Sequence, residues 1–147
     1  YRQFDHMLNL STVIGPGEGA ALLRIPGTDK GLAVSVDGNP RACASDPRAG
    51  AAELVKKAAM KVAAVGARPI AVVDNLNFGN PENPEVMWQV RETIEGISEA
   101  CEELGIPVVG GNVSFYNETD GVDIPPTPVI GMLALAESVS YQDDQRI

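Results

Sequence analysis

The fold is decided by the stretch Ala71-Val72-Val73-Asp74-Asn75, in which an uninterrupted apolar run stops on two polar residues. Two other runs stop in the same way, at Val34-Ser35-Val36-Asp37-Gly38-Asn39 and at Val108-Val109-Gly110-Gly111-Asn112-Val113-Ser114. One helix-like segment separates each pair of runs. Strands that alternate with helices in this way usually lie side by side, and ligands bind at their polar ends. We therefore expect an α/β fold in which the three polar clusters converge.

The residues in these clusters have the chemistry of a phosphate site. Asp37, Asp74 and Asn112 would place two carboxylates and an amide beside the pair Gly110-Gly111, and Mg²⁺ that carries nucleotide phosphates prefers a few oxygen ligands. Paired glycines let a backbone approach a ligand closely, and Ser114 can contact phosphate or metal. Asp37 is also typical of a turn, and the amide-rich loop after Asp74 is also typical of scaffolding. The residues alone predict a module that handles ATP or another phosphate.

Periodicity predicts an α/β sandwich: a mixed sheet of about four to five strands with two helices on one face. The turn residues between 25 and 32 predict an antiparallel hairpin, and Pro84 and Gly105 mark the start and end of the second helix, with Trp88 in its packed side. The uncovered face of so apolar a sheet should pair with another copy or domain. Strands are expected at 20–25, 32–37, 70–74, 106–109 and 128–135, a loop at 75–84, and helices between Pro47 and Gly66 and from Pro84 to Gly105.

Composition excludes several classes of protein. The net charge of −9 without a Lys/Arg cluster argues against a nucleic-acid partner, and no apolar stretch reaches the roughly 18 residues that a membrane span needs. Cys43 and Cys101 lack the spacing of a disulfide framework or zinc site, so we expect reduced thiols and a cytoplasmic location. We expect an entry arm at 1–19, one domain at 20–137, and at 138–147 a truncated linker to an absent C-terminal domain.

Three long motifs resemble phosphoribosylformylglycinamidine synthase (FGAM synthase), of the type with a separate synthetase subunit. They are Tyr1-Arg2-Gln3-Phe4-Asp5-His6-Met7, the segment 74–81 with 84–89, and Gly110-Gly111-Asn112-Val113-Ser114-Phe115-Tyr116-Asn117-Glu118-Thr119. This family belongs to the aminoimidazole ribonucleotide (AIR) synthetase superfamily, and its synthetase contains two repeats of an N-terminal and a C-terminal domain. The chain looks like the N-terminal domain of the second repeat, so the resemblance implies an AIR synthetase N-terminal domain-like fold.

The resemblance implies a part in the ATP-dependent conversion of formylglycinamide ribonucleotide (FGAR) and glutamine-derived ammonia to FGAM, in purine biosynthesis. It implies nucleotide contacts at Asp74 and Gly111, an Mg²⁺ ligand at Asn112 and a substrate contact at Ser114. The family's catalytic histidine lies in the first repeat, and the corresponding stretch here, 37–41, contains no histidine. We therefore predict no catalytic residue in this chain and an inactive isolated domain.

The same resemblance implies that the first synthetase repeat and a glutaminase subunit are partners, and the exposed sheet face predicts that the isolated domain is a homodimer. Two alternatives stay open at this point. The chain could belong to another enzyme of the superfamily, such as AIR synthetase itself. It could also be a non-catalytic nucleotide-binding or dimerisation module.

Overall fold

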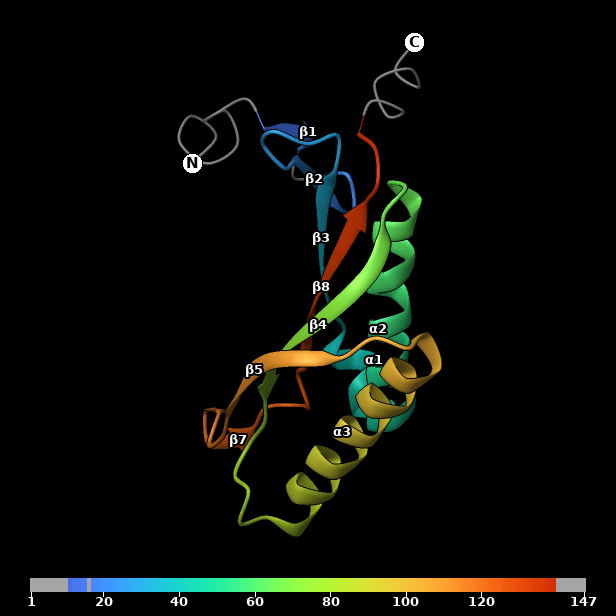
Figure 1. Ribbon diagram of the computed structural model, residues 1–147. Coiled ribbons are helices and arrows are strands. Elements are labelled where there is room, and N and C mark those ends of the chain that lie inside the picture. The colour runs from blue at the N-terminus through green and yellow to red at the C-terminus, as the bar shows by residue number, and fades with distance from the viewer. Residues whose placement is uncertain (1–10, 16, 140–147) are drawn as a thin grey trace.

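The computed structural model describes residues 11–15 and 17–139, which form a mixed six-stranded sheet with helices packed on one face (Figure 1). The strand order is β1-β2-β3-β8-β4-β5, and β4 and β5 are its parallel pair. The α/β class with helices on one face is thus confirmed, whereas the sheet has six strands rather than the four to five expected, because β1 lies in the segment expected to be an entry arm. The strands of the sheet are β1 (Thr12–Ile14), β2 (Ala21–Arg24), β3 (Gly31–Gly38), β4 (Arg68–Asn77), β5 (Val108–Ser114) and β8 (Val129–Ala136).

Local signals position the helices as the sequence predicts. The long helices are α2 (Pro47–Ala64) and α3 (Pro84–Leu104), and both begin with proline at the first helical position. Asp46 and Asn83 cap their N-termini, and Gly105, at φ 66°, ends α3 in the left-handed conformation that glycine adopts without strain. The sequence missed the six-residue helix α1 (Pro40–Ser45), because only its N-cap and proline mark it.

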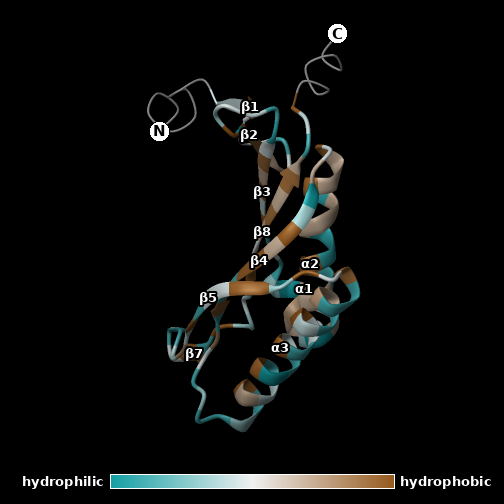
Figure 2. Ribbon diagram, in the orientation of Figure 1, coloured by the Kyte–Doolittle hydropathy of each residue, from teal (hydrophilic) through white to brown (hydrophobic). Residues whose placement is uncertain are grey.

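The core lies between the sheet and α2, which packs on β3, β8 and β4. Buried and more exposed residues alternate along β3 and β8. The buried set, which faces the helices, includes Ala33, Ser35 and Asp37 of β3 and every second residue of β8. Helix α3 packs along α2, where Gly96 is required because a Cβ would lie 2.1 Å from the Arg48 carbonyl oxygen. Figure 2 shows the resulting pattern, with apolar residues along the central strands and polar ones on the outer side of α3.

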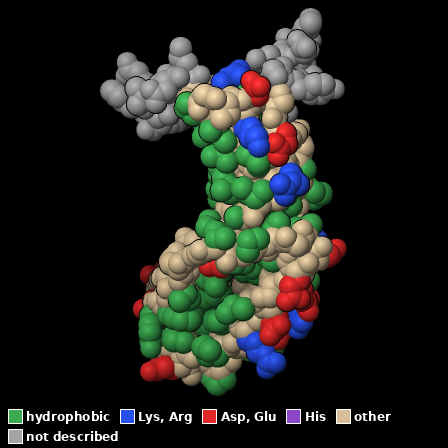
Figure 3. All heavy atoms as spheres, in the orientation of Figure 1, with side chains coloured by type: hydrophobic (Ala, Val, Ile, Leu, Met, Phe, Trp, Pro, Cys, Tyr) green, Lys and Arg blue, Asp and Glu red, His purple; other side chains and the backbone are tan. Residues whose placement is uncertain are grey.

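The opposite face of the sheet is open. Val36, Val73 and Val109 are 61%, 47% and 63% exposed and line a shallow apolar depression of about 290 Å³. Figure 3 shows hydrophobic side chains over the middle of the molecule, where these strands run. The helices therefore cover one face of the sheet, as the sequence predicts, and the opposite face is apolar where β3, β4 and β5 run.

Several element boundaries differ from the sequence prediction. Strand β4 continues to Asn77, and Gly110–Ser114 belong to β5, because these residues pair with each other in a parallel ladder. A small hairpin of β6 (Glu118–Thr119) and β7 (Val122–Asp123), joined by a turn at Asp120 and Gly121, lies between β5 and β8 in the sequence and was not predicted as strands. β1 falls within the expected entry arm, and Val139, in the expected linker, is buried. Within the described ranges, no helix has the length and apolar character to span a bilayer.

Candidate nucleotide site

A groove of about 380 Å³ runs between α3 and the edge strand β5. It exists because α3 packs on α2 rather than directly on β5, which leaves the end of β4 uncovered on the helix side. Its walls are mostly aliphatic, and Asp74 is the ionisable side chain in it. The lining residues are Asp74, Leu76, Val90, Ile94, Val108, Gly110, Gly111, Asn112, Val113 and Phe115.

Asp74 and Gly111 lie directly opposite each other in the β4–β5 ladder. A Cβ at position 111 would be 2.2 Å from Asp74 Oδ1 and 2.5 Å from the Asp74 carbonyl oxygen, so only glycine fits beneath this carboxylate. Partial burial raises the pKa of Asp74, and the side chain has no hydrogen-bond or ion-pair partner among the described residues. A desolvated acceptor without a partner is available to a ligand that donates hydrogen bonds.

Asn112 and Ser114 occupy the other face of the sheet. They pair in register with Asn75 and Asn77, and successive side chains in a strand point to opposite faces. Their side chains therefore point away from Asp74, although Asn112 is also among the residues that line the groove. Ser114 Oγ accepts a hydrogen bond from Asn117 Nδ2 at 3.0 Å, which fixes the serine hydroxyl in a local amide network.

The amide-rich loop after β4 is held by its own side chains. Asn117 Nδ2 also donates to the Phe78 carbonyl at 3.0 Å, and Asn77 Nδ2 donates to the Thr127 carbonyl at 3.1 Å. Phe78 is fully buried, and its ring centroid lies 6.1 Å from that of Phe115. Of the two interpretations that the sequence left open for this loop, scaffolding accounts for these amides.

The predicted convergence of Asp37 with Asp74 is wrong. Strand β8 lies between β3 and β4, and Ile130 separates the two aspartates in the same cross-strand row. At about 4.8 Å per strand, this places their backbones roughly 10 Å apart. Asp37 is instead 7% exposed and accepts a hydrogen bond from Lys61 Nζ at 2.7 Å. It is neither a simple turn residue nor a ligand, but half of a buried ion pair.

The donor set does not build a metal cage. Across residues 11–15 and 17–139, no three His, Cys, Asp or Glu side chains come together as ligands. Mg²⁺ often takes only one or two protein ligands and completes its shell with phosphate and water. A single amide oxygen from Asn112, on the open face, fits that mode, whereas a site formed by Asp37, Asp74 and Asn112 together does not.

The remaining polar, aromatic and thiol side chains lie outside the groove at Asp74, apart from His6, whose position the structure does not describe. Trp88 is 53% exposed, so its predicted place in the core is wrong. The guanidinium of Arg48, on α2, pairs with Glu92 and Glu99 of α3. Cys43 and Cys101 are free and buried, and burial raises the pKa of Cys43 to about 11. His6 lies outside the described residues.

The sequence missed the groove walls. Ile94 and Val108 are 46% and 44% exposed, although Ile94 shares a helical face with the buried residues Val90 and Ile97. The periodicity of a helix cannot show that α3 packs on α2 rather than on β5, so it does not predict that these two side chains are exposed. The usable signal was the unusual pair of glycines, of which Gly111 is the one that the geometry requires.

Comparison with known proteins identifies relatives over most of the chain. The family described as AIR synthase related protein, N-terminal domain, matches residues 17–136. PurL, a subunit of phosphoribosylformylglycinamidine synthase, is 57% identical over 139 residues in Moorella thermoacetica and 53% identical over 140 residues in Alkaliphilus metalliredigens. Each match covers 95% of this chain but 19% of the relative. The chain thus spans about a fifth of the length of these curated relatives.

Solved structures show the same relationship. PurLQS from Thermotoga maritima superposes with a TM-score of 0.84 at 36% identity, over 92% of this chain and 23% of that one. T. maritima PurL complexed with ATP superposes with a TM-score of 0.80 at 34% identity, and the same protein complexed with FGAR superposes with a TM-score of 0.79 at 36% identity. Both matches cover 92% of this chain and 22% of the PurL chain. The chain therefore belongs to the family of AIR synthase related proteins and contains their N-terminal domain.

Proposed function

We propose that this chain is part of the synthetase subunit of FGAM synthase, as the N-terminal domain of its second repeat. The complete enzyme would use ATP to activate the amide oxygen of FGAR as a phosphate ester, and ammonia from glutamine would displace phosphate to give FGAM and ADP. The support is the 57% identity to PurL over 95% of the chain and the likeness to PurL structures with ATP and with FGAR. Buried free thiols agree with a reducing, cytoplasmic location.

We propose that the groove between α3 and β5 contributes to nucleotide binding through Asp74 and Gly111. The observation that carries this proposal is the unpartnered carboxylate above a position where only glycine fits. Ligand groups that donate hydrogen bonds would satisfy this carboxylate, and the aliphatic walls would bury an apolar ring surface. Asn112 would hold Mg²⁺ together with phosphate oxygens, and Ser114 would contact the substrate. Mg²⁺, when bound, would neutralise charge on the phosphates.

Because Asn112 and Ser114 face away from Asp74, the proposed ligands would approach both faces of the sheet at the C-terminal ends of β4 and β5. In this proposal the nucleotide contact lies in the groove, and the metal and substrate contacts lie on the open face. No group of this domain is assigned to proton transfer, and we expect the domain alone to be inactive.

Calorimetric titration of MgATP and MgADP into the chain tests the nucleotide site. We expect saturable heat from the wild type and a loss of affinity of at least tenfold in Asp74→Ala. Glu82→Ala is the matched control, because Glu82 is an exposed carboxylate outside the groove. Absence of heat from the wild type, or equal affinities in all three proteins, would contradict the nucleotide proposal.

A non-catalytic dimerisation module is the second candidate function, and the open apolar face supports it specifically. The same face would pack against the first repeat in the whole enzyme and against a second copy in the isolated domain. If the calorimetry shows no nucleotide binding while sedimentation shows a dimer, this second function replaces the first. The glutaminase subunit is the further partner that the proposed activity requires.

A further inference from the structure

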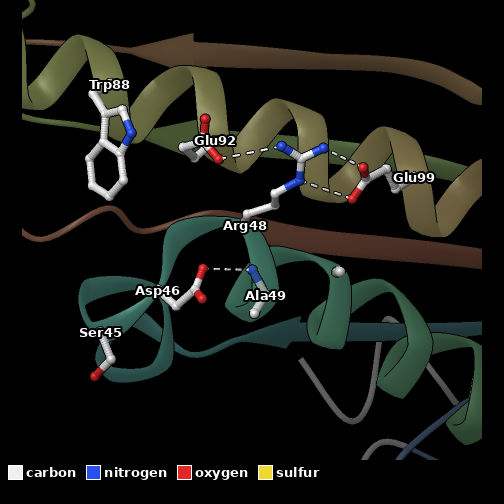
Figure 4. A pocket seen from close by; sticks show the side chains of 8 residues that line it. Ser45, Asp46, Arg48, Ala49, Trp88, Glu92 and Glu99 are labelled. Atoms are coloured by element: carbon white, nitrogen blue, oxygen red, sulfur yellow. Dashed lines mark hydrogen bonds and ion pairs between the residues drawn. The ribbon is translucent and has the colours of Figure 1, made fainter.

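A second pocket, of about 520 Å³, lies between α3 and the segment that joins α1 to α2 (Figure 4). It shares no residue with the groove at Asp74. We call it the Trp88 pocket. Its polar and aromatic lining consists of Ser45, Asp46, Arg48, Trp88, Glu92 and Glu99.

Trp88 is an exposed anchor on the rim of this pocket. It is the only tryptophan in the chain, and it lies 53% exposed beside Met87, which is 45% exposed. Trp and Met are enriched at protein interfaces, where a flat or flexible apolar side chain contributes much contact area. An exposed indole also presents its electron-rich face, which attracts cations.

The charges in the pocket are unbalanced. Asp46, Glu92 and Glu99 face one cation, Arg48, which leaves a formal charge of −2. Arg48 Nε and Nη2 both donate to Glu99, so these two groups neutralise each other. Glu92 Oε2 lies 3.6 Å from Arg48 Nη1, beyond the usual 2.7–2.9 Å of a charge-assisted hydrogen bond. Glu92 therefore keeps most of its capacity to accept.

The second partly available carboxylate belongs to Asp46. Its Oδ1 accepts from the Ala49 backbone N–H at 2.9 Å and caps α2, while Oδ2 has no hydrogen-bond partner among the described residues. Figure 4 shows Asp46 and Ser45 across the pocket from Trp88 and Glu92. A cation entering between them would meet Asp46 on one side, and Trp88 with Glu92 on the other.

We propose that the Trp88 pocket binds an arginine or lysine side chain presented by a partner protein. The cation would lie over the Trp88 ring and pair with Glu92, whose side chain is only 21% exposed and so is screened less than a rim charge. Arg48 already shows that the two helices accommodate a guanidinium between carboxylates. A polypeptide partner, rather than a free cation, fits the adjacent exposed Met87, which extends the contact beyond the charged group.

Trp88 fluorescence tests the proposal directly, because the signal comes from a single tryptophan at the pocket. The probe is acetyl-Gly-Arg-Gly amide, and acetyl-Gly-Gln-Gly amide is its neutral counterpart. We expect a saturable change with a dissociation constant on the order of 1 mM for the arginine peptide, weakened by added salt, and none for the glutamine peptide.

Two variants locate the interaction. Glu92→Gln should weaken binding of the arginine peptide about fivefold or more, whereas Glu103→Gln, on the same helix but paired with Lys56, should leave it unchanged. Circular dichroism melting confirms that both variants are folded. Equal responses to the two peptides, or superimposable titrations of Glu92→Gln and wild type, would overturn the proposal. Spermidine binding more tightly than the peptide would overturn the assignment to a protein partner.

Discussion

Replacing Lys61 with methionine should destabilise the domain far more than an ordinary surface substitution. Lys61 Nζ lies 2.7 Å from Asp37 Oδ1, and the two side chains are 30% and 6% exposed. Asp37 Oδ2 is buried without a hydrogen-bond partner, so removal of the ammonium leaves the carboxylate with no partner on either oxygen. Methionine keeps the length of the apolar stem, which restricts the change to the loss of the charge.

The expected cost follows from the burial of the pair. Removing one partner of a buried ion pair costs about 3–5 kcal/mol, and the partial exposure of Lys61 places this case near about 3 kcal/mol. For a chain of this size, that loss lowers the melting temperature by roughly 10 °C. Urea unfolding followed by circular dichroism measures the free energy of unfolding, and calorimetry measures the melting temperature.

Two controls make this result specific. Lys30→Met breaks the exposed pair with Glu137, whose side chains are 48% and 68% exposed, and should cost at most about 0.5 kcal/mol. The double variant Asp37→Leu/Lys61→Met removes both charges and should recover most of the loss, since no buried charge remains. If Lys61→Met costs no more than Lys30→Met, Asp37 is solvated and its assignment as a buried partner is wrong.

Three further predictions concern the groove, the helix contact and the open face. Because burial raises the pKa of Asp74, the charged carboxylate destabilises the folded state at pH values above that pKa. Asp74→Asn should therefore raise the melting temperature at pH 7, and this gain should shrink towards pH 4 when it is measured by differential scanning fluorimetry. Gly96→Ala would press a Cβ onto the Arg48 carbonyl and should lower the free energy of unfolding by about 2 kcal/mol, measured in urea. Val36→Lys should abolish any self-association through the open face in sedimentation velocity, whereas Met60→Lys, an equally exposed position on α2, should not.

The sequence by itself determined the elements that local chemistry specifies. Pro84 and Gly105 bound α3 because proline fits the first helical turn and glycine adopts the left-handed C-cap without strain. The turn residues between β2 and β3 specified an antiparallel hairpin, which the structure contains. The family motifs led to the AIR synthetase N-terminal fold, which the comparisons confirm.

Local patterns could not determine the order of strands in the sheet. β8 lies between β3 and β4, and its pairing with β3 joins residues nearly a hundred positions apart in the sequence. No local motif specifies that pairing. The insertion separates Asp37 from Asp74 and leaves Asp37 to pair with Lys61. Two aspartates that each follow an apolar run in the sequence therefore have different surroundings in the structure.

Only the tertiary structure decided which side chains share a face. The register of the β4–β5 ladder shifts between Val72 and Val73, because β5 contains one extra residue at this point. The shift sets Gly111 opposite Asp74 and directs the Asn112 side chain to the opposite face of the sheet. The packing of α3 on α2 likewise left Ile94 exposed, although it shares a helical face with the buried residues Val90 and Ile97. A sequence specifies periodicity within an element, whereas register and packing angle depend on contacts between elements that are distant along the chain.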